Sequence, residues 1–436
     1  MIVKGIRDLT EGERERIINR NRMNLEEILP KVKEILDNVR RRGDEALREY
    51  TRKFDRVDIE DFRVYQEEIE RAYEKVDDKV ISAIERAYEK IRMFHEMQLE
   101  GIRDWEIERG GITTGQIVRP IESAGCYIPG GRAFYPSTVL MTVVPAKVAG
   151  VKRVVVVSPP YGKELNPVTL VASNIAGADE IYKVGGAQAI GALAYGTETI
   201  PKVDIVVGPG NIYVTGAKML VGGSEVKIDF PAGPSEVLII CDEGAKEEYV
   251  AMDLLAQGEH DPNASCVVLT TSREKALSIR EKVLELMKDV ERRDILERSL
   301  ENMAILYGDI MECIKFSNEY APEHLEIMTE NPREILKYIE NAGSVFLGEY
   351  APVPVGDYAT GTNHVLPTGG YARMYSGLSV DYFIKKISVQ ELSREGLESI
   401  SEIVTTLAEV EGLYNHAKAV KIRLRDRDVH KGCPGK

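Results

Sequence analysis

The chain contains few cysteines, and no two of them are closely spaced. Its 436 residues include five cysteines, and the spacing CxxC does not occur. A disulfide framework and a zinc site made of thiolates are therefore not indicated. Cys241 and Cys266 lie within or at the end of apolar runs that are typical of strands, so we expect buried, unreactive thiols. The other cysteines are Cys126, Cys313 and Cys433.

The chain also lacks long apolar runs and an excess of positive charge. No apolar run reaches the ~18 residues that a membrane span needs, and the N-terminus MIVKGIRDLTEGERERIINR has no signal-peptide core. The net charge of −14 argues against a nucleic-acid-binding surface. With 43% hydrophobic and 29% charged residues, we expect a soluble, cytoplasmic protein that binds neither nucleic acid nor membranes.

The sequence pattern predicts helices first and then alternating strands and helices. Residues 1 to about 105 place apolar residues at helical spacing among charges, which predicts a helical segment. From about 127 to 236, β-branched runs such as RVVVVS and DIVVG alternate with small-residue helices. This alternation indicates a parallel, Rossmann-like α/β sheet. A second α/β run extends from SEVLIICD to GSVFLGE, and a last helix, GLESISEIVTTLAEVEGLYNHAKAV, precedes a polar tail.

The stretch GPGNIYVTGAK (208–218) is a candidate anion-binding site. It follows a predicted strand and opens a predicted helix, where free backbone amides bind anions such as a pyrophosphate. Gly-Pro-Gly turns are common, however, and VGGAQAIG (184–191) only approximates the dinucleotide fingerprint GxGxxG. The residues alone therefore leave nucleotide binding open.

Three other stretches contain residues that can bind a metal. In AQGEH, Gln257 and His260 are three residues apart, so on a helix their side chains share a face and can share a metal ion. The other two pairs are Asp357 with His364 in a long loop, and Glu411 with His416 near the end of the last helix. Each stretch also has an ordinary interpretation, namely a helix end, an Asx-turn beside a solvent histidine, and a solvated helix end.

Glu323 and His324 are adjacent titratable residues behind a proline. Pro322 biases Ala321 toward an extended conformation, which predicts a loop that leads into a strand-like LEIM. Adjacent side chains on an extended backbone point to opposite sides, which argues against a hydrogen-bonded pair. His324 alone remains a candidate general base, since a histidine ordinarily titrates near neutral pH.

Together these stretches resemble the histidinol dehydrogenase family. The motifs YIPGGRAFYPSTVLM, GGAQAI, GPGN, PAGPSEVL, QGEH, APEHLE, GDYATGTNHVLPT and EGLYNHA occur in the order seen in that family, over residues 127–416. The resemblance implies the oxidation of L-histidinol to L-histidine through the aldehyde, the last step or steps of histidine biosynthesis, with two NAD and one zinc ion per site. It also implies a homodimer in which the C-terminal region of each chain completes the site of the partner.

The resemblance further implies a fold and a set of domains. The fold is α/β, with two Rossmann-like parallel-sheet domains (aldehyde-dehydrogenase-like), a helical N-terminal segment and a small C-terminal tail domain. The expected domains are an N-terminal helical extension (1–24), a discontinuous metal and substrate domain (25–126 with 237–378), an NAD-binding domain (127–236) and a tail domain on the partner subunit (379–436).

Individual roles follow from the same resemblance. The implied zinc ligands are Gln257, His260, Asp357 and His416, which would also meet the substrate. Further implied substrate contacts are Ser235, His324 and Glu411, and the implied NAD contacts are Tyr127, Gln188 and Asn211. We hypothesise that His324 takes the alcohol proton and that Glu323 activates the water that attacks the aldehyde.

Two other functions are compatible with the residues alone. A zinc hydrolase could use the same histidine and aspartate residues, with Glu323 or Glu259 as the base. A two-lobed binding protein for a small molecule could also be built from two α/β domains. The first alternative predicts turnover without NADH, and the second predicts binding without turnover.

Overall fold

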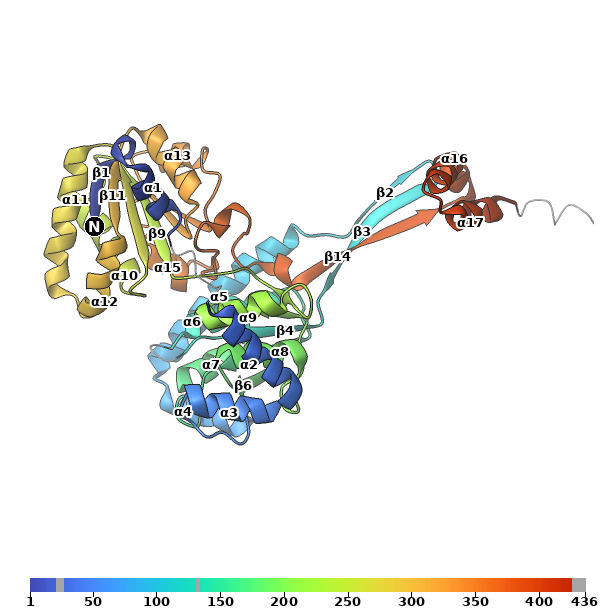
Figure 1. Cartoon of the computed structure of the whole chain (residues 1–436), viewed down its shortest axis with the longest axis horizontal. Coiled ribbons are helices and arrows are strands. Elements are labelled where there is room, and N and C mark those ends of the chain that lie inside the picture. The colour runs from blue at the N-terminus through green and yellow to red at the C-terminus, as the bar shows by residue number, and fades with distance from the viewer. Residues whose placement is uncertain (21–26, 131–133, 426–436) are drawn as a thin grey trace, which may run out of the picture. The chain divides into compact units, whose positions relative to one another are not determined.

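The computed structural model describes residues 1–20, 27–130 and 134–425 (Figure 1). They form two compact units: the first lies within Met1–Gln98 and Ile121–Phe383, and the second lies within Leu99–Pro120 and Ile384–Lys436. Cys433 and residues 21–24 of the expected N-terminal extension lie outside the described residues.

The first unit contains a six-stranded parallel sheet. In spatial order its strands are β1 (Ile2–Gly5), β11 (Ala304–Tyr307), β10 (Ser265–Thr270), β9 (Glu236–Cys241), β12 (His324–Met328) and β13 (Ser344–Leu347). Successive side chains of β9 enter opposite cores, with Val237 and Ile239 on one face and Leu238 and Ile240 on the other. The apolar run of this strand is continuous because both of its faces are buried.

Helices cover both faces of this sheet. One face packs against α10 (Glu247–Gly258), α11 (Arg273–Leu286), α12 (Arg293–Ser299) and α15 (Val353–Tyr358). The opposite face packs against α1 (Glu11–Ile18), α13 (Ile310–Tyr320) and α14 (Pro332–Leu336). Capping boxes begin α1 and α13, where a threonine or aspartate and a glutamate three residues later bind each other's backbone amides.

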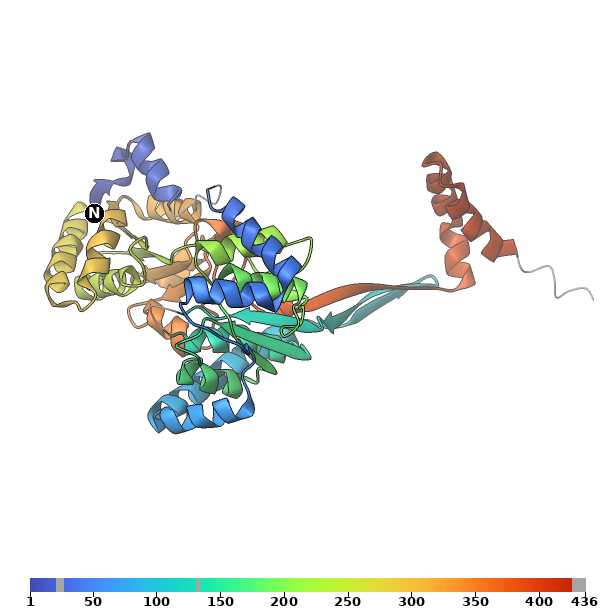
Figure 2. The ribbon, with the colours of Figure 1, turned by 60° about the horizontal axis from the view of Figure 1, so that its bottom comes forward.

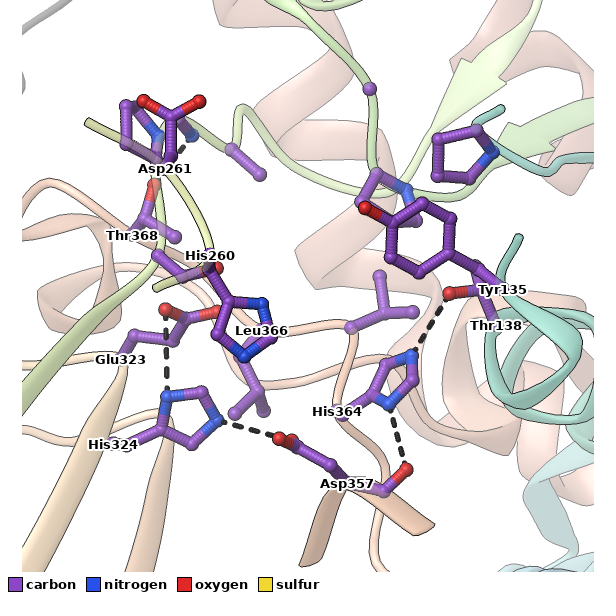
Figure 3. A pocket seen from close by; sticks show the side chains of 18 of the residues that line it. Tyr135, Thr138, His260, Asp261, Glu323, His324, Asp357, His364, Leu366 and Thr368 are labelled. Atoms are coloured by element: carbon purple, nitrogen blue, oxygen red, sulfur yellow. Dashed lines mark hydrogen bonds and ion pairs between the residues drawn. The ribbon is translucent and has the colours of Figure 1, made fainter. Parts of the chain in front are cut away.

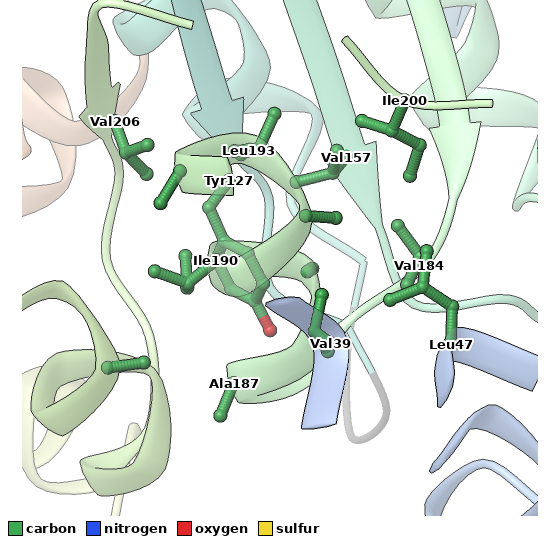
Figure 4. Packing of buried hydrophobic residues seen from close by; sticks show 14 of the residues in the cluster. Val39, Leu47, Tyr127, Val157, Val184, Ala187, Ile190, Leu193, Ile200 and Val206 are labelled. Carbon is green, nitrogen blue, oxygen red and sulfur yellow. The ribbon is translucent and has the colours of Figure 1, made fainter. Parts of the chain in front are cut away.

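A second parallel sheet in the first unit has five strands. In spatial order these are β6 (Glu180–Lys183), β5 (Arg153–Ser158), β4 (Ser123–Tyr127), β7 (Ile205–Val207) and β8 (Lys227–Ile228). One buried cluster joins this sheet to α2 (Leu29–Arg42), α3 (Asp44–Phe54), α8 (Gly186–Tyr195) and α9 (Ile212–Val221) (Figure 4). The remaining helices of this part are α4 (Gln66–Lys75), α5 (Asp78–Glu100), α6 (Pro136–Val148) and α7 (Pro167–Ala176). The predicted α/β class with two parallel sheets is confirmed.

The N-terminal segment divides between the two sheets. Residues 2–5 form β1, which pairs in parallel with β11, although the sequence predicted only helices there. The chain between α3 and α4 binds the edge strand β6, where the Val64 amide donates to the Ile181 carbonyl at 2.9 Å. Residues 25–126 were predicted to form one domain with 237–378, but α2 and α3 pack on the five-stranded sheet, because their apolar faces match α8 and α9.

The second unit is an antiparallel sheet with two helices. The sheet has the order β14 (Ile384–Leu392), β3 (Ile112–Pro120) and β2 (Trp105–Arg109), and it was not predicted. The single last helix that was predicted is two packed helices, α16 (Arg394–Val410) and α17 (Tyr414–Arg425) (Figure 2). They are separated at Gly412, whose positive φ of 75° suits a glycine at a helix end.

Within the described residues, no helix combines the length and apolarity needed to cross a bilayer. The four cysteines that the structure describes are free and buried, as predicted for Cys241 and Cys266. Burial raises the pKa of all four thiols, which keeps them protonated and unreactive.

Candidate active site

A cavity of about 700 Å³ in the first unit gathers most of the residues singled out from the sequence. They are Asn211, Ser235, Gln257, His260, Glu323, His324, Asp357 and His364. Figure 3 labels the last five of them. Ser235 and Glu323 lie directly before β9 and β12, and Asn211 lies in the loop that follows β7. The cavity is therefore lined from the amino ends of strands in one sheet and the carboxyl end of a strand in the other.

The turn before His324 differs from its prediction. Ala321 adopts the left-handed region, with φ of 50° and ψ of 67°, instead of an extended conformation. It ends α13, since the Ala321 amide still donates to the Ser317 carbonyl at 2.8 Å and the following proline cannot continue a helix. The strand begins at His324, as expected from LEIM.

The imidazole of His324 has one nitrogen bound and one free. Its Nδ1 lies 3.1 Å from the backbone carbonyl of Glu236, and this carbonyl can only accept a hydrogen bond. Nδ1 therefore carries a proton, which leaves Nε2 as the basic nitrogen of the neutral ring. Nε2 is buried without a hydrogen-bond partner among the described residues and lies 3.7 Å from Oδ1 of Asp357.

The carboxylates around His324 favour a second proton on the ring, which gives the charged imidazolium. Burial disfavours the charged imidazole and acts to lower its pKa, but the nearby Glu323 and Asp357 carboxylates outweigh burial and raise the pKa of His324 to about 9. Oε2 of Glu323 lies 3.5 Å from Nδ1 (Figure 3). The two side chains therefore lie close together, although adjacent residues on an extended backbone were predicted to point to opposite sides. Oε2 of Glu323 also accepts a hydrogen bond from the Glu236 amide at 2.8 Å.

Three of the four implied zinc ligands line this cavity. Gln257 lies in the last turn of α10 and is buried, His260 follows two residues after that helix and is exposed, and Asp357 lies in α15. Among the residues that the structure describes, no group of three or more histidine, cysteine, aspartate or glutamate side chains is arranged to hold a metal. An amide oxygen, an imidazole and a carboxylate suit zinc chemically, and they leave the shell open for a ligand from elsewhere.

His416 and Glu411 belong to the second unit and do not line the cavity. Both side chains are exposed, Glu411 at the end of α16 and His416 in α17. Their assignments as zinc and substrate ligands remain predictions.

His364 holds Asp357 in place. Its Nδ1 lies 2.9 Å from the backbone carbonyl of Asp357, and its Nε2 lies 3.2 Å from the hydroxyl of Thr138 (Figure 3). Both nitrogens thus have partners, and burial lowers the pKa of His364, which favours the neutral ring. Thr138 was not predicted as a site residue, because a threonine within an apolar helix is usually a packing residue.

The implied NAD contacts lie in two places. Asn211 lines the cavity and begins α9, where its side chain accepts hydrogen bonds from the Tyr213 and Val214 amides at 3.0 and 3.1 Å. Tyr127 and Gln188 are buried beside the start of α8, outside the cavity. The Tyr127 hydroxyl accepts from the Gly186 amide at 3.2 Å, and Oε1 of Gln188 has no hydrogen-bond partner among the described residues.

This fold, with a cavity lined from two parallel sheets, places the chain in the α/β class. The sequence matches the family model described as histidinol dehydrogenase over residues 18–424. The chain belongs to the histidinol dehydrogenase family.

Known proteins support this membership along the whole chain. Histidinol dehydrogenase of Methanococcus maripaludis is 67% identical, over 97% of this chain and 100% of the relative. That of Methanocaldococcus jannaschii is 64% identical, over 98% of this chain and 99% of the relative. A crystal structure of histidinol dehydrogenase from Elizabethkingia anophelis has a TM-score of 0.92 at 41% identity, and the match covers 98% of each chain.

Proposed function

We propose that the protein oxidises L-histidinol to L-histidine through a bound aldehyde, with two NAD reduced per turnover, in the last step or steps of histidine biosynthesis. The observation that carries this proposal is that one cavity brings Glu323 and His324 together with Gln257, His260 and Asp357 in a chain of this family. The expected cytoplasmic location remains a prediction.

In the first oxidation, the neutral imidazole of His324 accepts the hydroxyl proton of histidinol, so this step should become faster as pH rises toward about 9, where the charged ring loses its second proton. The free Nε2 faces the cavity side that holds Asp357, so it is the atom that would take this proton. The alcohol carbon loses a hydride to the nicotinamide of the first NAD, which leaves the aldehyde.

In the second oxidation, Glu323 acts on water. Its carboxylate would remove a proton from the water that attacks the aldehyde carbon, and the resulting hydrate loses its hydride to the second NAD. The Glu236 amide holds Oε2 of Glu323 at 2.8 Å, which orients the carboxylate for this step. The described thiols are buried, which agrees with a mechanism that uses no cysteine nucleophile.

We assign zinc binding to Gln257, His260, Asp357 and His416. Zinc, when bound, would supply a Lewis-acidic anchor for the amine and imidazole of the substrate. We assign NAD binding to Tyr127, Gln188 and Asn211, where the unpartnered Oε1 of Gln188 offers an acceptor to a ligand. Ser235 and Glu411 would contact the substrate.

We also propose a homodimer in which the second unit completes the partner's site. Helix α16 exposes large apolar side chains at helical spacing, with Ile403 at 60%, Leu407 at 58% and Val410 at 82% exposure, and Tyr414 at the start of α17 is 70% exposed. An apolar stripe of this kind is typical of a protein–protein contact. It lies next to Glu411 and His416, the assigned substrate and zinc ligands that do not line the cavity.

The function is tested by following NADH absorbance after histidinol is added to the purified protein with NAD. We expect NADH formation that a chelator abolishes and that added zinc restores. Turnover of a hydrolysable substrate without NADH would support the zinc hydrolase alternative, and histidinol binding without turnover would support a binding protein.

A further inference from the structure

Arg20 and Glu236 form a buried ion pair next to the turn that holds Glu323 and His324. Nε and Nη2 of Arg20 donate to the two carboxylate oxygens of Glu236, each at 2.7 Å. Arg20 is 8% exposed and Glu236 is fully buried. A bidentate pair of this kind has a fixed geometry, because the planar guanidinium matches the carboxylate.

Arg20 also binds the turn itself. Its Nη1 donates to the Tyr320 carbonyl at 2.7 Å, and its Nη2 approaches the Ala321 carbonyl at 3.4 Å. The guanidinium carbon lies 3.3 Å from the centre of the Tyr320 ring. Ala321 has a positive φ, which is strained for a residue other than glycine and persists only where the surroundings hold it.

Glu236 contacts both proposed catalytic residues. Its Oε1 accepts hydrogen bonds from the Glu323 amide at 3.3 Å and from the Gly369 amide at 3.0 Å. Its backbone amide binds the Glu323 carboxylate, and its backbone carbonyl binds Nδ1 of His324. One residue therefore fixes the backbone and the carboxylate of Glu323 and the tautomer of His324.

We propose that Arg20 and Glu236 are positioning residues whose ion pair holds Glu323 and His324 in their working geometry. The proposal rests on the proposed oxidation of histidinol. It gives the segment after α1 a role in the reaction, although Arg20 itself does not line the cavity.

The test compares Arg20→Gln with Arg14→Gln in the full-length protein. Arg14 lies in α1 and docks it on α13, through Glu319 and the Phe316 ring, and it makes no hydrogen bond or ion pair with Glu236. We expect Arg20→Gln to lower kcat by about 10- to 100-fold, since small displacements of reacting groups have effects of that size. The KM for histidinol and NAD should stay within about threefold, because substrate binding is retained.

Arg14→Gln should keep kcat within about twofold. Arg20→Lys should recover part of the lost kcat, because it restores the positive charge without the planar guanidinium group.

Hydrogen exchange measured by mass spectrometry tests the positioning without any turnover. We expect faster exchange in peptides that contain the Glu323 and Gly369 amides for Arg20→Gln, and no change there for Arg14→Gln. If wild-type protein makes no NADH from histidinol, the proposed function fails, while the exchange result still decides whether the ion pair holds the turn.

Equal losses of kcat in the two variants, or unchanged exchange in Arg20→Gln, would overturn the proposal. Should Arg20→Gln not fold, Glu236→Gln takes its place, since it keeps an acceptor for the two amides and breaks one arm of the ion pair. Unaltered kcat and exchange in Glu236→Gln would overturn the proposal equally.

Discussion

Glu323 and His324 serve different half-reactions in the proposed mechanism. Replacing Glu323 by Gln keeps the hydrogen-bond acceptor for the Glu236 amide but removes the base for water. We therefore expect E323Q to lower oxidation of added histidinal by about 10²- to 10⁴-fold, and to affect oxidation of histidinol to the aldehyde much less. The measurement is NADH formation in single turnovers that start from each substrate.

His324→Gln is the matched variant for the first half-reaction. It should depress histidinol oxidation at least as strongly, because Nε2 accepts the alcohol proton. Equal losses of both half-reactions in E323Q would contradict the division of roles.

Glu326 is a carboxyl group inside an apolar core. It lies on β12 between Ile239 and Phe346 of the neighbouring strands and is 1% exposed. Oε1 accepts from the Val353 amide at 2.8 Å, while Oε2 has no N–H or O–H donor among the described residues. Burial and the neighbouring Asp253 carboxyl both disfavour a charge on Glu326, which favours a protonated carboxyl group at this position.

This pair makes the stability depend on pH. Burial raises the pKa of Asp253 to about 6, and burial together with Asp253 raises that of Glu326 well above its usual value. The unfolded chain loses these protons first, so the folded state loses stability as pH rises above about 4. We expect Glu326→Gln to raise the free energy of unfolding by roughly 1–3 kcal/mol at pH 8 and to change little at pH 4.

Urea unfolding at the two pH values measures this effect. Glu281→Gln on α11 is the control, since Glu281 is exposed. A gain in Glu326→Gln that is the same at both pH values would show that the pKa of Glu326 is not raised in the folded protein.

The loop before α9 depends on the backbone of Gly208. Its φ is 115°, and a side chain there would collide with the Tyr127 carbonyl. The buried ion pair of Lys218 and Asp229 holds it from both sides, with Nζ donating to the Gly208 carbonyl at 2.9 Å and Oδ2 accepting from its amide at 2.8 Å. These contacts fix the path of the chain toward Asn211.

Gly208→Ala should therefore disturb the proposed NAD site. We expect a loss of stability of about 1–3 kcal/mol and a KM for NAD that rises roughly tenfold. Gly223→Ala is matched, because Gly223 also has a positive φ but open space around it. A KM for NAD that rises equally in both variants would indicate general strain and no role for this loop.

The elements show which features a sequence can predict. The central strands were predicted because apolar β-branched runs buried on both faces are distinctive, as in EVLIIC and RVVVVS. β1 was not predicted because four residues are too few to show a repeating apolar pattern. β2, β3 and β14 were not predicted because their exposed or half-buried residues mix polar and apolar types. Which sheet α2 and α3 cover depends on tertiary packing that no local pattern encodes.

The site was predicted in a similar way. The quoted motifs identified the residues that gather in the cavity, including Asp357 and His324. The contacts that orient them were not predicted, because Thr138 and Arg20 become neighbours of the site only through folding. Glu236 offered a signal, since it is an acidic residue at the start of an otherwise apolar strand.

At the scale of the whole molecule, the proposed dimer predicts complementation between two inactive variants. Asp357→Asn removes a ligand from the cavity, and His416→Asn removes the ligand assigned to the partner's site. A heterodimer of the two would contain one intact site, so mixed and re-associated chains should recover about a quarter of wild-type activity. No recovery, with heterodimers present by native mass spectrometry, would contradict a site shared between subunits.

The most direct test of the proposed function is the amount of NADH formed from limiting histidinol. With excess NAD and zinc-loaded protein, we expect two NADH and one L-histidine for each histidinol, and no free aldehyde in solution. One NADH for each histidinol with release of the aldehyde, or no NADH, would contradict the four-electron oxidation.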